Sequence, residues 1–158
     1  VIFASVFSLV TKNCRKFVKE KNMSNLETIK AIYEAFGKGD VPFILSCLDE
    51  NVAWEKWNNN HAQNSGVPYM QEKNSVAGVA DFFVEVGKMG VKMANVLSIM
   101  DGGDKFAVEF EIETERFGYE EEIHLWTFSE NGKVVAFRHY FDTAKHIAAN
   151  EKYQSAKA

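Results

Sequence analysis

The stretch FAVEFEIETE, residues 106–115, places the strongest constraint on the fold because it alternates apolar and acidic residues. Neighbouring side chains of a β-strand point to opposite faces of a sheet, so this pattern predicts a strand with one buried face. Val108, Phe110 and Ile112 form that face, and the glutamates between them then point to solvent or to a partner. We therefore do not expect these carboxylates to form an acid–base pair inside the protein.

Turn signals predict that this strand is one of several. Glycine- and asparagine-containing turns separate predicted strands over 92–100, 105–116, 119–128 and 133–142. A short strand is also expected near residues 51–57, before a loop rich in asparagine, glycine and proline.

Helices are also predicted before, between and after these strands. Ser24 and Glu27 have the spacing of a capping box, and apolar residues follow them at helical spacing. Asp40 and Ser75 can cap a second and a third helix, and a short helix can follow from Thr143. Helices followed by an antiparallel meander are typical of the α+β class.

The two ends of the chain are expected to lie outside one domain over residues 23–150. Residues 1–22 begin with an apolar run followed by basic residues, an order opposite to that of a secretory signal. The run is also shorter than the roughly 20 residues of a membrane-spanning helix. We expect an extension there, with an amphipathic segment that touches a membrane as the alternative, and a tail over 151–158.

Composition restricts the classes of partner. A net charge of -4 provides no basic surface for a phosphate backbone, so no nucleic acid is expected, and no membrane partner. Aromatic residues make up 13% of the chain, which suits a packed core or an apolar cavity. Cys14 and Cys47 are too few for a zinc site or a disulfide framework, so we expect reduced thiols and a cytoplasmic protein.

Two strands carry candidate chemistry. In EEEIHLWTF, residues 120–128, His124 shares a face with Glu122 and Trp126. In VVAFRHYFDTA, residues 134–144, His139 shares a face with Phe137 and Phe141. Since both faces of these strands are partly apolar, alternation alone does not show which face points inward.

Several segments resemble, in the right order, the ketosteroid isomerase-like or SnoaL-like family of the nuclear transport factor 2-like superfamily. They are YEAFGKGD (33–40), DENVAWE (49–55), GVPY (66–69) and HLWTF…NGKVVAFRHYFDTA (124–144), and the resemblance runs from about 23 to 150. It implies a cone-shaped α+β barrel, with three helices packed on the concave face of a strongly bent, mostly antiparallel sheet. It also implies a homodimer formed through the outer face.

The resemblance further implies a pocket that His139 faces. In limonene epoxide hydrolases, which are similar over the last hairpin, an aspartate that points into the pocket stands at this position. The other catalytic positions of those hydrolases fall on Phe110 and Ile112. Those of the ketosteroid isomerases fall on Ile32, Lys56 and His124, so neither catalytic set is kept.

An aromatic-lined pocket for a small apolar or aromatic molecule is therefore expected. The predicted ligand-binding residues are Tyr33, Trp54, Tyr69, Phe110, Ile112, Trp126, Phe137 and Phe141. The predicted catalytic residues are His124 and His139, an acid–base pair for isomerase-, cyclase- or dehydratase-type proton transfer, with Lys56 as a further candidate. No cofactor and no metal are expected, because the histidines lack an inward carboxylate partner in this interpretation.

Alternatives remain for each of these groups. The histidines can be core residues satisfied by hydrogen bonds, and Lys56, near a strand end, can extend its ammonium group to water. His61 and His146 are predicted to lie at the surface. The alternative function is a non-catalytic ligand-binding or protein-association module, since a fold does not determine a function.

Overall fold

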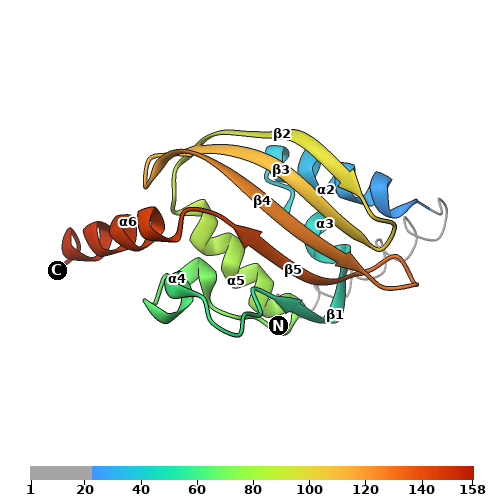
Figure 1. The fold of residues 1–158 in the computed structure, drawn as a ribbon, viewed down its shortest axis with the longest axis horizontal. Helices are drawn as coiled ribbons and strands as arrows, with labels where there is room; N and C mark the ends of the chain where they lie inside the picture. Colours follow the sequence, from blue (N-terminus) through green and yellow to red (C-terminus); the bar gives the residue numbers. More distant parts are fainter. Residues whose placement is uncertain (1–22) are drawn as a thin grey trace, which may run out of the picture.

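The computed structural model describes residues 23–158 and shows helices packed against a single bent sheet (Figure 1). The elements are α2 (Asn25–Lys38), α3 (Val41–Ser46), β1 (Leu48–Trp54), α4 (His61–Asn64), the short 3₁₀ helix η1 (Pro68–Met70), α5 (Val76–Gly87), β2 (Val91–Asp101), β3 (Lys105–Thr114), β4 (Gly118–Phe128), β5 (Val134–Tyr140) and α6 (Thr143–Ser155). The predicted extension over 1–22 lies outside the described residues.

The predicted helix starts are confirmed. Ser24 and Glu27 form a complete capping box at α2, and Gly39 ends this helix in the left-handed conformation that glycine adopts without strain. The side chains of Asp40 and Ser75 accept hydrogen bonds from backbone N–H groups at the starts of α3 and α5. These caps satisfy donors that have no partner within a helix.

The sheet has the strand order β1-β5-β4-β3-β2. The pairs from β5 to β2 are antiparallel, and β1 pairs with β5 in parallel. Helices α2, α3 and α5 contribute Ile29, Ile44 and Val79 to the same apolar core as Val108 and Trp126 of the sheet. This arrangement is the predicted cone-shaped α+β fold.

Strand β3 alternates as predicted. Val108, Phe110 and Ile112 are buried. Glu109 and Glu111 point to the other face, where they accept hydrogen bonds from Ser98 and Asn95 of β2. The outward orientation of these glutamates is therefore confirmed.

Some boundaries differ from the prediction. Helix α6 continues through Ser155, beyond the predicted end near residue 150, and projects from one end of the sheet (Figure 1). The loop after β1 contains α4 and η1, which are too short to produce a periodic pattern. Among the described residues, no helix is long and apolar enough to span a membrane.

Candidate functional site

A cavity of about 80 Å³ lies between the sheet and helices α2 and α5, large enough for several water molecules. Its wall is mostly aromatic and apolar. The polar side chains in the wall are Tyr33, Tyr69, Glu122, His124, His139 and His146.

Aromatic rings from neighbouring strands form one side of the cavity. Trp54 of β1 pairs with Phe137 of β5, which pairs with Trp126 of β4. The rings of Trp54 and Phe137 stack at 4.1 Å, and Phe82 of α5 meets the indole edge-on at 5.2 Å. The indole Nε1 of Trp54 is buried with no hydrogen-bond partner among residues 23–158, so it lies among rings that offer only weak π acceptors.

The first polar group is a chain of hydrogen bonds through His124. Nε2 of His124 lies 3.0 Å from Glu122 Oε2, and Nδ1 lies 2.6 Å from the Tyr33 hydroxyl. A carboxylate only accepts, so Nε2 carries the proton and Nδ1 accepts from Tyr33. The Tyr33 oxygen in turn accepts from Trp126 Nε1 at 3.1 Å. Both nitrogens of His124 are therefore engaged.

Burial sets the protonation states of this chain. It lowers the pKa of His124 below 6.5, although Glu122 partly offsets the effect, so the imidazole stays neutral. Burial raises the pKa of Tyr33 and keeps its hydroxyl protonated. Burial alone would raise the pKa of Glu122, but the hydrogen bond from His124 and the nearby histidines hold it below 4.5.

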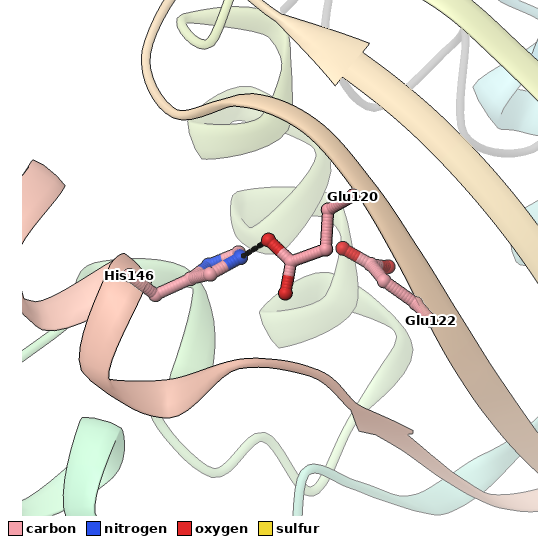
Figure 2. Close-up of side chains that lie close together, drawn as sticks. All are labelled: Glu120, Glu122 and His146. Carbon is pink, nitrogen blue, oxygen red and sulfur yellow. Dashed lines mark hydrogen bonds and ion pairs between the residues drawn. The ribbon is translucent and has the colours of Figure 1, made fainter.

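The second polar group also consists of a glutamate, a histidine and a tyrosine. His146 of α6 places Nε2 2.8 Å from Glu120 Oε2 and Nδ1 2.8 Å from the Tyr69 hydroxyl. Figure 2 shows the Glu120 carboxylate between His146 and Glu122. The Lys145 ammonium lies 3.6 Å from Glu120 Oε2. The prediction that His146 lies at the surface is wrong, since its side chain is 1% exposed.

The third group pairs His139 with Glu55. Nδ1 of His139 lies 2.5 Å from Glu55 Oε1, which also accepts from the backbone N–H of His139 at 3.1 Å. The other carboxylate oxygen accepts from Trp57 Nε1 at 2.7 Å. Burial alone would lower the pKa of His139, but the charge of Glu55 and its hydrogen bond raise it above 6.5. Among residues 23–158, Nε2 of His139 makes no hydrogen bond, and it is not one of the fully buried polar atoms without a partner, so it keeps some accessible surface.

Backbone geometry explains why Glu55, rather than Lys56, lies inside. Glu55 has a φ of 53°, in the left-handed region that a non-glycine residue adopts rarely and at a cost of about 1–3 kcal/mol. Trp54 is held to Lys73 by two backbone hydrogen bonds, and strand alternation stops there. Glu55 is consequently 0% exposed, whereas Lys56 is exposed and does not line the cavity. The inward orientation considered for Lys56 is therefore wrong.

One cluster has the composition of a metal site. Ligand atoms of Glu120, Glu122 and His146 lie within 4.8 Å of one another (Figure 2). However, each side chain is engaged in the hydrogen bonds described above, and His146 Nε2 carries the proton that Glu120 accepts. A metal ion would have to displace that proton and tolerate the Lys145 ammonium group, so the cluster fits a hydrogen-bonded network better than a metal centre.

The structure brings most of the predicted site residues together. The cavity wall includes the predicted residues Tyr33, Trp54, Tyr69, Phe110, Ile112, His124, Trp126, Phe137 and His139. Phe141 does not line the cavity but stacks on His139 at 4.5 Å and meets the His146 ring at a tilt, with ring centres 4.1 Å apart. His61 is exposed, as predicted.

Three carboxylates were missed by the sequence interpretation. The prediction that the histidines lack an inward carboxylate is wrong, because Glu120 and Glu122 share the inward face of β4 with His124. Strand alternation contained this signal. For Glu55 no periodic signal existed, because a backbone turn determines its orientation.

The bent sheet, the covering helices and the internal cavity define an α+β protein of the nuclear transport factor 2-like class. The family model of the SnoaL-like domain matches residues 29–137. The chain belongs to this family.

Solved structures with the same fold share low sequence identity with the chain. A nuclear transport factor 2-like protein of unknown function from Burkholderia pseudomallei is 24% identical, with a TM-score of 0.64. The match covers 80% of this chain and 98% of the Burkholderia protein. TerC, co-crystallised with polyporic acid, is 23% identical with a TM-score of 0.62 and the same coverage. Bal32a, from a soil-derived mobile gene cassette, is 20% identical with a TM-score of 0.62, covering 77% and 92%. A comparison with curated protein sequences gave no match.

Proposed function

We propose that the chain binds a small, mostly apolar molecule in the cavity and that His139 transfers a proton to or from it. The observation that carries this proposal is the third histidine group. Of the three histidines in the cavity wall, His139 has a ring nitrogen without a partner among the described residues, and a buried carboxylate holds its other nitrogen. This arrangement is the one that an acid–base histidine needs.

The geometry assigns a role to each member of the pair. Glu55 accepts from Nδ1–H and thereby selects the tautomer with a lone pair on Nε2. When Nε2 takes up a proton, the Glu55 carboxylate stabilises the imidazolium ion. The raised pKa of His139 makes the imidazole a stronger base than an ordinary histidine. Glu55 is therefore a positioning residue, and His139 is the group that reacts.

His124 has a different role in this proposal from the one that the sequence suggested. Since both of its nitrogens are engaged, we assign it to positioning: with Glu122 it holds the Tyr33 hydroxyl in the cavity wall. Tyr33 stays protonated and donates its one proton to His124 Nδ1, so we propose it as a fixed polar point of the wall beside the ligand. The cyclase, isomerase or dehydratase character of the reaction depends on the ligand.

A two-stage experiment tests this function. Cyclic ketones, steroids, polyketide-like aromatics and epoxides are screened for an increase in Tm, and each stabilising compound is incubated in D₂O and followed by NMR. A ligand at 100 times its Kd stabilises the folded state by about 2.7 kcal/mol, which corresponds to several degrees. We expect His139→Gln to slow hydrogen–deuterium exchange of the bound compound by about 100-fold.

His61→Gln is the matched control, because His61 is an exposed histidine outside the cavity. This variant should behave as the wild type does. Binding without exchange would contradict catalysis and favour the alternative, a non-catalytic ligand-binding module. A panel in which no compound raises Tm would contradict the proposed function itself.

We also propose a homodimer formed through the outer face of the sheet. Leu97 and Met100 of β2 and Tyr140 of β5 are about half exposed, which favours a surface covered by a second copy. Light scattering should give twice the chain mass of 17.9 kDa. A Leu97→Glu/Met100→Glu variant should give 17.9 kDa, whereas a monomeric wild type would contradict the dimer.

A further inference from the structure

The three glutamate–histidine groups of the cavity share a pattern that one of them leaves incomplete. In each group a buried carboxylate accepts the proton of one imidazole nitrogen. In two groups a tyrosine hydroxyl occupies the other nitrogen, at 2.6 Å for Tyr33 on His124 and 2.8 Å for Tyr69 on His146. In the third group the corresponding nitrogen, Nε2 of His139, makes no hydrogen bond among residues 23–158 and keeps some accessible surface.

The chemistry around His139 restricts what can occupy that position. When the imidazole is neutral, Nε2 of the tautomer that Glu55 selects is an acceptor, so the ligand atom must bring a proton. A carboxylate on the ligand is disfavoured, because Glu55, Glu120 and Glu122 already place negative charge in this part of the protein. The rings of Phe137 and Phe82 lie 6.0 and 6.4 Å from the His139 ring, so the group that carries the hydroxyl lies among aromatic side chains.

We infer that the ligand carries an acidic hydroxyl group, a phenol or an enol, whose oxygen binds Nε2 of His139 and completes the third group as tyrosine completes the other two. The inference rests on the proposed function and identifies the atom on which His139 acts. The O–H bond of the ligand breaks, an Nε2–H bond forms, and the electron pair stays on the ligand oxygen. Glu55 neutralises the imidazolium ion, and no further reactant is required.

Three single-ring compounds of similar shape test the inference: para-nitrophenol, its methyl ether para-nitroanisole, and nitrobenzene. Calorimetry gives the three Kd values for the full chain. We expect para-nitrophenol to bind at least about tenfold more tightly than either other compound, because they leave Nε2 without a donor. In ¹⁵N-detected NMR, the Nε2 resonance of His139 should shift with para-nitrophenol and stay unchanged with para-nitroanisole.

A double variant removes the imidazole without leaving a buried charge behind. In His139→Phe/Glu55→Gln the Kd values for para-nitrophenol and para-nitroanisole should become equal, whereas His61→Phe, altered at an exposed histidine, should keep the tenfold preference. Equal Kd values in the wild type, or an unchanged His139 resonance, would overturn the inference and leave apolar ligand binding intact. If none of the three compounds binds, the proposed function fails together with the inference.

Discussion

Replacing Glu55 by alanine is expected to lower the free energy of unfolding by about 3–5 kcal/mol, because three donors lose the buried carboxylate that accepts from them. Glu55 is 0% exposed, and its carboxylate accepts from His139 Nδ1, from the backbone N–H of His139 and from Trp57 Nε1. Alanine leaves the two His139 donors buried without an acceptor and removes the partner of the half-buried Trp57 indole. Urea unfolding monitored by circular dichroism measures the loss.

Two control variants test whether any substitution in this segment lowers the free energy of unfolding. Glu55→Gln keeps the shape and an acceptor oxygen, so it should cost less, about 1–2 kcal/mol. Lys56→Ala changes the exposed neighbour and should stay within about 0.5 kcal/mol of the wild type. A Glu55→Ala loss no larger than that of Lys56→Ala would show that the buried pair contributes nothing to stability.

The same pair gives the unfolding free energy a defined dependence on pH. The folded-state pKa of His139 lies above its ordinary value of 6.5, so the folded state binds this proton more tightly than the unfolded state does. This contribution is fully present below 6.5 and is lost as the pH rises through the folded-state pKa. His124, whose pKa is lowered, has the opposite effect, which fades above 6.5 as the imidazole of the unfolded chain becomes neutral. Glu55→Gln should flatten the slope above that pH.

Trp54→Ala is expected to cost about 3–5 kcal/mol, the range for truncating a large buried aromatic side chain. Trp54 is 1% exposed and contacts the rings of Phe82, Phe83, Trp126 and Phe137. Its removal enlarges an apolar cavity that the surrounding rings can fill only in part. Added indole should therefore bind in the new space and raise the Tm of the variant.

Trp54→Phe is the matched control, since it keeps a ring against Phe137 and should cost less than the alanine variant. Indole should raise the Tm of Trp54→Ala by several degrees more than that of the wild type. An equal effect on both proteins would place indole in the natural cavity rather than in the space left by Trp54. A loss below about 1 kcal/mol in Trp54→Ala would contradict a central packing role for this ring.

Local patterns in the sequence were sufficient to predict the longer helices and the strands of the fold, but not α4 and η1. The alternation in β3 and the caps of α2, α3 and α5 depend on residues within a few positions of one another. The same alternation places His124 with Glu120 and Glu122 on one face of β4, although it did not show that this face points inward. Only the family resemblance predicted that the sheet bends into a cone, because alternation does not indicate how strands curve.

The pairings of Glu55 with His139 and of Glu120 with His146 were decided by the tertiary structure alone. Glu55 meets a histidine 84 residues later, and Glu120 meets one 26 residues later. The first contact depends on a left-handed backbone conformation at Glu55, and the second on where α6 docks after β5. Neither leaves a periodic signal. A buried carboxylate and a buried histidine stabilise each other only when the complete fold removes both from water and places them within hydrogen-bonding distance.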